Sequence, residues 1–104
     1  MKPYKVIIAS PALSDIQEIT KWYNKCQPKL GSRFQQSIKQ QIATLKNNAN
    51  RYSNRYLTVR CMIVKKFPYL VHFTIDDQNG IVEIFAIIHT SRNPDLWEER
   101  SKPL

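Results

Sequence analysis

Apolar residues follow different spacings along the chain, and each spacing predicts a different kind of element. A β-branched run at residues 5–9 predicts a first strand. Apolar side chains then recur every three or four residues over 12–26 and again over 30–45, which is the repeat of an amphipathic helix. Because only a short break around Pro28 separates these two patterns, they predict a helical hairpin whose second helix spans about residues 29–48.

Particular residues mark where the helices begin and end. Ser10 is expected to cap the first helix, and Pro11 suits its first position because the N–H that proline lacks would have no partner there. Asp15 and Glu18 follow in the early turns, where the helix dipole favours negative charge. The polar run over residues 51–56 predicts a loop after the second helix.

The second half of the chain has the pattern of strands. Three runs rich in β-branched and aromatic residues cover 58–65, 67–76 and 81–89. Gly80 closes the loop between the last two, where its freedom to adopt a positive φ is useful. The last run is apolar on both faces, which predicts a central strand. Asn93 followed by Pro94 predicts a short final helix.

These elements define a fold class. The expected order is β-α-α-β-β-β-α, an α+β fold in which an antiparallel meander sheet packs against the helical hairpin. A length of 104 residues suits one domain, so a single domain is expected over residues 1–104. No stretch approaches the roughly 18 apolar residues of a membrane span, and no signal peptide is evident. We therefore expect a cytoplasmic protein.

Charge is distributed unevenly along the chain. Sixteen Lys and Arg against eight Asp and Glu give a net charge of +8, and residues 29–66 hold nine of the basic residues and no acid. This excess favours a polyanionic partner, either nucleic acid or an acidic protein, over a surface that is basic only for solubility. The candidate nucleic-acid- or partner-binding residues are Arg51, Arg55, Lys65 and Lys66. The alternative is that these side chains are simply solvated.

Cysteine and histidine placement gives no sign of a metal or cofactor site. Cys26 and Cys61 have no metal-ligand spacing and form no disulfide framework, so both are expected to be buried thiols. His72 alternates onto the same strand face as Leu70 and is expected to be structural. No metal and no organic cofactor are expected, because the chain has neither a glycine-rich phosphate loop nor a histidine–carboxylate cluster.

Several segments, taken in order, are typical of one family. The chain resembles the RelE/ParE superfamily of type II toxin–antitoxin modules, and it is closer to the ParE-like branch. The resemblance covers nearly the whole chain, and its strongest part lies between residues 59 and 100. The matching segments are Val59-Arg60, Lys66-Phe67-Pro68-Tyr69, Ile87-Ile88-His89 and the run from Arg92 through Pro94 to Trp97.

The resemblance implies a toxin that causes growth inhibition and plasmid stabilization, with a cognate acidic antitoxin that neutralises it. ParE-like members inhibit DNA gyrase, whereas RelE-like members are ribosome-dependent mRNA endoribonucleases. Fold alone does not decide between the two activities. A third possibility is a toxin fold that has lost its toxicity and only binds its partner.

A ribonuclease would use three residues of this chain. Arg60 would contact the scissile phosphate, His89 would transfer protons, and Arg92 would add a second cation. Each has a structural alternative: Arg60 in an ion pair with Glu83, His89 hydrogen-bonded at a strand end, and Arg92 fixing the final helix.

The C-terminal tail favours the gyrase inhibitor. RelE-like enzymes often carry a catalytic Tyr or His among basic residues at the end of the chain, as the family pattern implies. Here residues 97–104 contain neither, and Glu98 and Glu99 would repel RNA. The sequence therefore predicts a ParE-like inhibitor of gyrase, with the endoribonuclease as the alternative.

Overall fold

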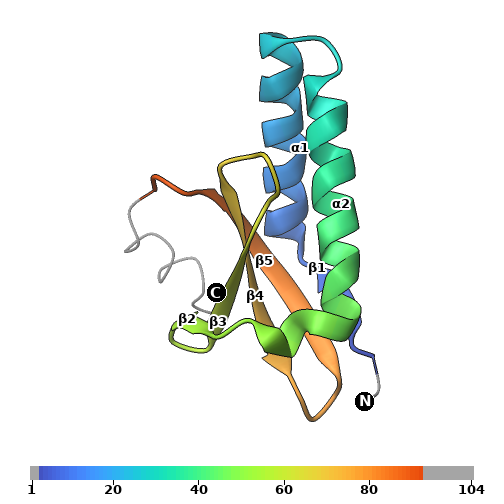
Figure 1. Ribbon diagram of the computed structural model, residues 1–104, viewed down its shortest axis with the longest axis vertical. Helices are drawn as coiled ribbons and strands as arrows, with labels where there is room; N and C mark the ends of the chain where they lie inside the picture. The colour runs from blue at the N-terminus through green and yellow to red at the C-terminus, as the bar shows by residue number, and fades with distance from the viewer. Residues whose placement is uncertain (1–2, 93–104) are drawn as a thin grey trace.

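The computed structural model describes residues 3–92, in which a helical hairpin covers one face of a five-stranded sheet (Figure 1). This is the expected α+β class. The hairpin is formed by helices α1 (Ser10–Cys26) and α2 (Leu30–Asn48), followed by one turn of 3-10 helix, η1 (Ala49–Arg51). The strands are β1 (Lys5–Ile8), β2 (Asn54–Tyr56), β3 (Val59–Ile63), β4 (Tyr69–Asp76) and β5 (Ile81–His89).

The sheet is mixed because its first strand joins the meander from the far side. The strand order is β1-β5-β4-β3-β2, and β3, β4 and β5 are antiparallel neighbours as predicted. β1 runs parallel to β5, with Lys5 opposite Ile81. Parallel neighbours need a long crossover, which the helical hairpin and the meander supply. β5 thus lies between β1 and β4, as its two apolar faces predicted.

The segment between α2 and β3 is more ordered than the sequence predicted. The predicted polar loop over 51–56 was wrong in part, because it contains the end of η1 and the edge strand β2. A strand of three residues with two exposed polar side chains is too short to show alternation. The final helix predicted after Asn93 lies outside the described residues.

The start of α1 also differs from the prediction. Ala9, rather than Ser10, is the N-cap, and no side chain caps this helix. The backbone of Ala9 is instead tied to the sheet, because its N–H donates to the Ile84 carbonyl at 2.8 Å. The first turn of α1 holds no acidic residue, so the helix dipole does not account for Asp15. Its Oδ2 instead accepts the N–H of Ile87 at 3.0 Å. This hydrogen bond gives a backbone N–H of β5 a partner beyond the point where the pairing with β1 ends.

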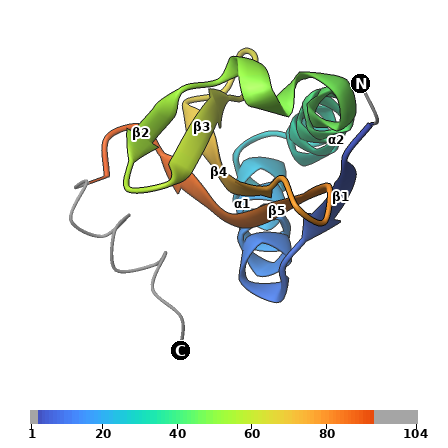
Figure 2. The same ribbon diagram turned by 90° about the horizontal axis from the view of Figure 1, so that it is seen from below.

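The core lies between the hairpin and the sheet. Figure 2 shows the molecule from below, with α2 seen nearly end-on. The helical repeats supply the buried residues Ala12, Ile16, Phe34, Ile38, Ile42 and Leu45. The helices come closest at Gly31, whose N–H donates to the Asn24 side chain at 2.8 Å. A Cβ built on Gly31 would lie 2.3 Å from the Thr20 carbonyl oxygen, so only glycine fits there. Neither described α-helix is both long and apolar enough to cross a membrane.

Candidate functional site

An aromatic cluster lies where β4 begins and β5 ends, against the two helices of the hairpin. His89 is opposite Tyr69 in the antiparallel ladder, and their rings meet edge to face with centroids 5.1 Å apart. Tyr69 in turn contacts Phe34 at 5.7 Å and Tyr23 at 6.3 Å. The cluster therefore joins the end of the sheet to the hairpin through Tyr69, and the His89 ring packs against Tyr69 at its edge.

A backbone hydrogen bond indicates which tautomer the neutral ring of His89 adopts. Its Nδ1 accepts the N–H of Ser91 at 3.1 Å, and the Ser91 hydroxyl lies 2.8 Å from the same nitrogen. The neutral ring therefore carries its proton on Nε2. Arg92 is close by, because its N–H donates to the His89 carbonyl at 3.0 Å. Burial raises the pKa of Tyr69, and the charge of Arg92 opposes that shift. The structure thus brings His89 and Arg92 together.

Arg60 lies at the other end of the sheet. It is opposite Phe73, four residues along β4 from Tyr69, the partner of His89. At about 3.4 Å per residue this offset is about 14 Å along the strand, before the spacing between strands is added. The guanidinium Nη1 donates to the Tyr52 carbonyl at 2.8 Å. The three residues expected of a ribonuclease therefore occupy two separate places.

The ion pair considered for Arg60 does not form across the sheet. Arg60 is opposite Phe73, which belongs to the core under the helices. Glu83 is opposite Thr74, the next residue of β4, and successive side chains of a strand point to opposite faces. Arg60 and Glu83 are therefore on different faces, and the Tyr52 carbonyl is the acceptor that the structure gives the guanidinium.

Lys65 and Lys66 line a groove between α2 and the β3–β4 turn, with a volume of about 690 Å³. We call this the basic groove. Two helix side chains hold the turn in place: Ser37 donates to the Lys65 carbonyl at 3.1 Å, and Gln41 donates to the Ile63 carbonyl at 2.7 Å. Gln41 also accepts the N–H of Lys65. The polar and charged side chains that line it are Arg33, Gln36, Ser37, Gln40, Lys65 and Lys66.

The other two predicted cations are not part of this groove. Arg51 is in η1 and Arg55 in β2, and both are exposed. They belong with Arg60 to the part of the chain around β2, since β2 pairs with the start of β3. Burial raises the pKa of the Cys61 thiol to about 11, and the positive charge of Arg55 opposes this shift. The four basic residues singled out from the sequence thus form two groups.

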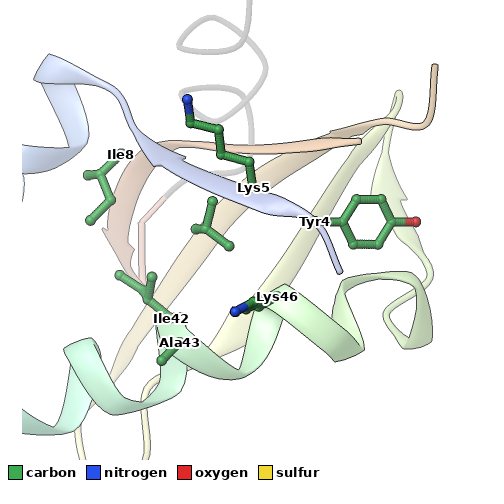
Figure 3. A pocket seen from close by; sticks show the side chains of 7 residues that line it. Tyr4, Lys5, Ile8, Ile42, Ala43 and Lys46 are labelled. Carbon is green, nitrogen blue, oxygen red and sulfur yellow. The ribbon is translucent and has the colours of Figure 1, made fainter. Parts of the chain in front are cut away.

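A second, mainly apolar groove runs along β1 and over the hairpin, and the sequence did not reveal it. One part has a volume of about 360 Å³ and lies between β1 and α2 (Figure 3). The adjoining part, about 450 Å³, reaches α1, and both parts share Ile8, Ile42 and Ala43. We call the two parts together the β1 groove. Its lining also includes Leu13, Lys5, Lys39 and Lys46.

The other cysteine and histidine residues take no part in these grooves. His72 is fully buried, and its Nδ1 lies 3.0 Å from the Tyr56 hydroxyl and 3.4 Å from Cys61 Sγ. Both cysteines were expected to be buried. Cys26 is exposed because it is the last residue of α1, and Cys61 is only partly buried. Within residues 3–92, no three His, Cys, Asp or Glu side chains come together in a way that could hold a metal ion.

Comparison with known protein families shows to which family the chain belongs. The model of the ParE toxin of type II toxin–antitoxin systems, parDE, matches residues 6–94. The chain belongs to the ParE toxin family. Among curated proteins, none is significantly similar to it in sequence.

Solved structures share the ParE-family fold of this chain. A chain of the chromosomal ParDE system from P. aeruginosa superposes with a TM-score of 0.77 at 18% identity, over 88% of this chain and all (100%) of that one. A mutant E. coli RelE toxin in the free state gives 0.68 at 13% identity, covering 94% of each chain. The RelBE2 complex from Mycobacterium tuberculosis gives 0.58 at 17% identity, over 88% of this chain and 97% of that one. At these identities the likeness establishes the fold.

Proposed function

We propose that this ParE-family toxin inhibits DNA gyrase in the cytoplasm and is neutralised by a cognate acidic antitoxin. The observation that carries the choice of target is the separation of Arg60 from His89, on top of membership of the ParE family. Cleavage of RNA needs a cation at the phosphate and a proton-transferring group within hydrogen-bond reach of the same nucleotide. An offset of about 14 Å along one strand is too large for one phosphate.

The alternative, a ribosome-dependent mRNA endoribonuclease, has one observation in its favour. His89 lies beside Tyr69, Ser91 and Arg92, and its Nε2 is the ring nitrogen that does not contact Ser91. His89 could transfer protons there, and Arg92 could meet a phosphate. In that enzyme Arg60 would serve only to bind RNA outside the reacting phosphate.

The β1 groove suits the neutralising partner. Its floor contains the apolar residues Ile8 and Ile42, and 47% of the Leu13 side chain is exposed beside it. Lys39 and Lys46 flank this floor from α2. An amphipathic segment with apolar anchors and acidic flanks would bury the floor and pair with the lysines. A disordered acidic antitoxin segment that folds on binding has that chemistry.

The target is tested by expressing the chain without a partner in bacteria and following two readouts in the same cells. Relaxed plasmid or broken DNA with intact mRNA is the expected result for gyrase inhibition. New mRNA 5′ ends within translated codons, lost in both His89→Ala and Arg92→Ala, would establish the endoribonuclease instead. Normal growth with neither change would show that the chain is not toxic to these cells, and only its membership of the family would stand.

A further inference from the structure

The basic groove is a concave surface whose lining is positively charged and mainly polar. Three cations, Arg33, Lys65 and Lys66, line it without an acidic side chain among its lining residues. Between them are the uncharged hydrogen-bonding groups of Gln36, Ser37 and Gln40, and its apolar members are Leu30 and Phe67. The groove lies within residues 29–66, the stretch that has no acid in sequence.

We propose that the basic groove binds the sugar–phosphate backbone of duplex DNA. Phosphate oxygens accept hydrogen bonds from cationic side chains and from uncharged donors, and this groove offers both kinds. Such contacts do not depend on the base sequence. The choice of DNA over RNA rests on the proposed function, because gyrase works on duplex DNA. The binding itself needs no gyrase.

The helix geometry matches the spacing of phosphates. Arg33, Gln36, Ser37 and Gln40 succeed one another at intervals of three and four, so they form one face of α2. From Arg33 to Gln40 this face is about 10 Å long. Successive phosphates of one DNA strand rise by about 3.4 Å along the duplex axis and also turn around it, so a straight face of this length reaches about two of them.

The opposite wall is held in position before any ligand binds. Lys65 and Lys66 are in the β3–β4 turn, which Ser37 and Gln41 tie to α2 through hydrogen bonds of 3.1 and 2.7 Å. Lys66 has a φ of 71°, a left-handed conformation that turns the chain sharply at this point. Phe67 anchors the end of the turn, since its ring lies 5.3 Å from that of Phe34. The cations are therefore presented from a fixed backbone.

The contrast with the β1 groove argues against a peptide in the basic groove. The β1 groove offers Ile8, Ile42 and Leu13, which an amphipathic segment needs as anchors. In the basic groove the exposed positions are charged or amide side chains, and α2 places its own apolar stripe in the core. The two faces of α2 thus differ in chemistry, one suited to a peptide and the other to phosphates.

The test is a binding assay of the full chain with a fluorescent 20-base-pair duplex of mixed sequence, over a series of salt concentrations. Each lysine–phosphate contact contributes about 0.9 to the slope of log K against log salt. Lys65→Gln/Lys66→Gln is therefore expected to lower the slope by about 1.8 and to weaken binding at 0.1 M salt by at least roughly tenfold. The matched control, Lys39→Gln/Lys46→Gln, removes the same charge from the other face of α2 and should change binding by less than about threefold.

The outcomes separate this inference from its alternatives. No binding by the wild type at 50 mM salt, or an equal loss in both double variants, would overturn it. Tighter binding of RNA or of polyglutamate through Lys65 and Lys66 would replace DNA by another polyanion. Unfolding curves like those of the wild type exclude misfolding, and Arg33→Gln, at an exposed helix position, is a second test of the groove. Gyrase inhibition is measured separately, so either proposal can fail alone.

Discussion

Replacing Gly31 by Ala tests the packing of the helical hairpin, because α2 lines both grooves and α1 lines part of the β1 groove. A Cβ at this position would lie 2.3 Å from the Thr20 carbonyl oxygen and 2.7 Å from the Asn24 side chain. Ordinary contacts begin about 1 Å further out, and the Thr20 carbonyl is part of a helix and cannot rotate away. The helices must therefore move apart.

The magnitude follows from three opposing contributions. Overpacking of this kind costs about 1–3 kcal/mol, and we expect a cost of about 2 kcal/mol because the group in the way is a backbone carbonyl. The Asn24–Gly31 hydrogen bond of 2.8 Å weakens, at a cost of about 1 kcal/mol. Alanine recovers about 1 kcal/mol through its better helix propensity. Gly31→Ala should therefore lower the free energy of unfolding by about 2 kcal/mol and Tm by roughly 10 °C.

Urea unfolding followed by circular dichroism measures this change. Ser32→Ala is the matched control, because Ser32 is exposed one residue further along α2 and should gain only about 0.4 kcal/mol from propensity. If Gly31→Ala were as stable as the wild type, or were stabilised like the control, the close helix contact would not exist and the argument would fail.

Three further predictions follow from other contacts. Asp15→Ala leaves a β5 amide without its 3.0 Å acceptor and should lower the free energy of unfolding by about 1–3 kcal/mol in the same urea assay. Leu13→Asp should weaken antitoxin binding by about tenfold in calorimetry, since it puts an acid where an apolar anchor meets an acidic partner. Leu57→Asp, at a site 60% exposed, is the control and should have no effect. Cys61 should react with a thiol reagent far more slowly than exposed Cys26 at pH 8, because burial raises its pKa to about 11 and leaves little thiolate. Equal rates would contradict the partial burial of Cys61.

The helices and the central strands could be predicted because their burial is periodic. Ile38, Ile42 and Leu45 recur at helical intervals and are all buried in the core, and the two apolar faces of β5 correctly indicated a central strand. Local spacing does not say which strand lies beside which. The parallel pairing of β1 with β5 joins residues more than seventy positions apart and left no mark in the sequence pattern.

The candidate site was harder to predict for the same reason. Arg60 and His89 were grouped by chemistry, but the ladder offsets them along β4, and only the register reveals the offset. Lys65 and Lys66 were identified from charge alone, whereas their groove depends on Ser37 and Gln41, polar helix residues with no distinctive pattern. The one local sign of the β1 groove is Leu13, which belongs to the apolar stripe of α1 and is nevertheless exposed.

The most direct test of the central claim is a supercoiling assay with purified gyrase, relaxed plasmid and the purified full chain. The account predicts that the wild type blocks supercoiling, that His89→Ala blocks it equally, and that adding the cognate antitoxin restores it. Uninhibited supercoiling at a large excess of the chain, together with codon-specific cleavage of mRNA on ribosomes that His89→Ala abolishes, would contradict the account and assign the endoribonuclease.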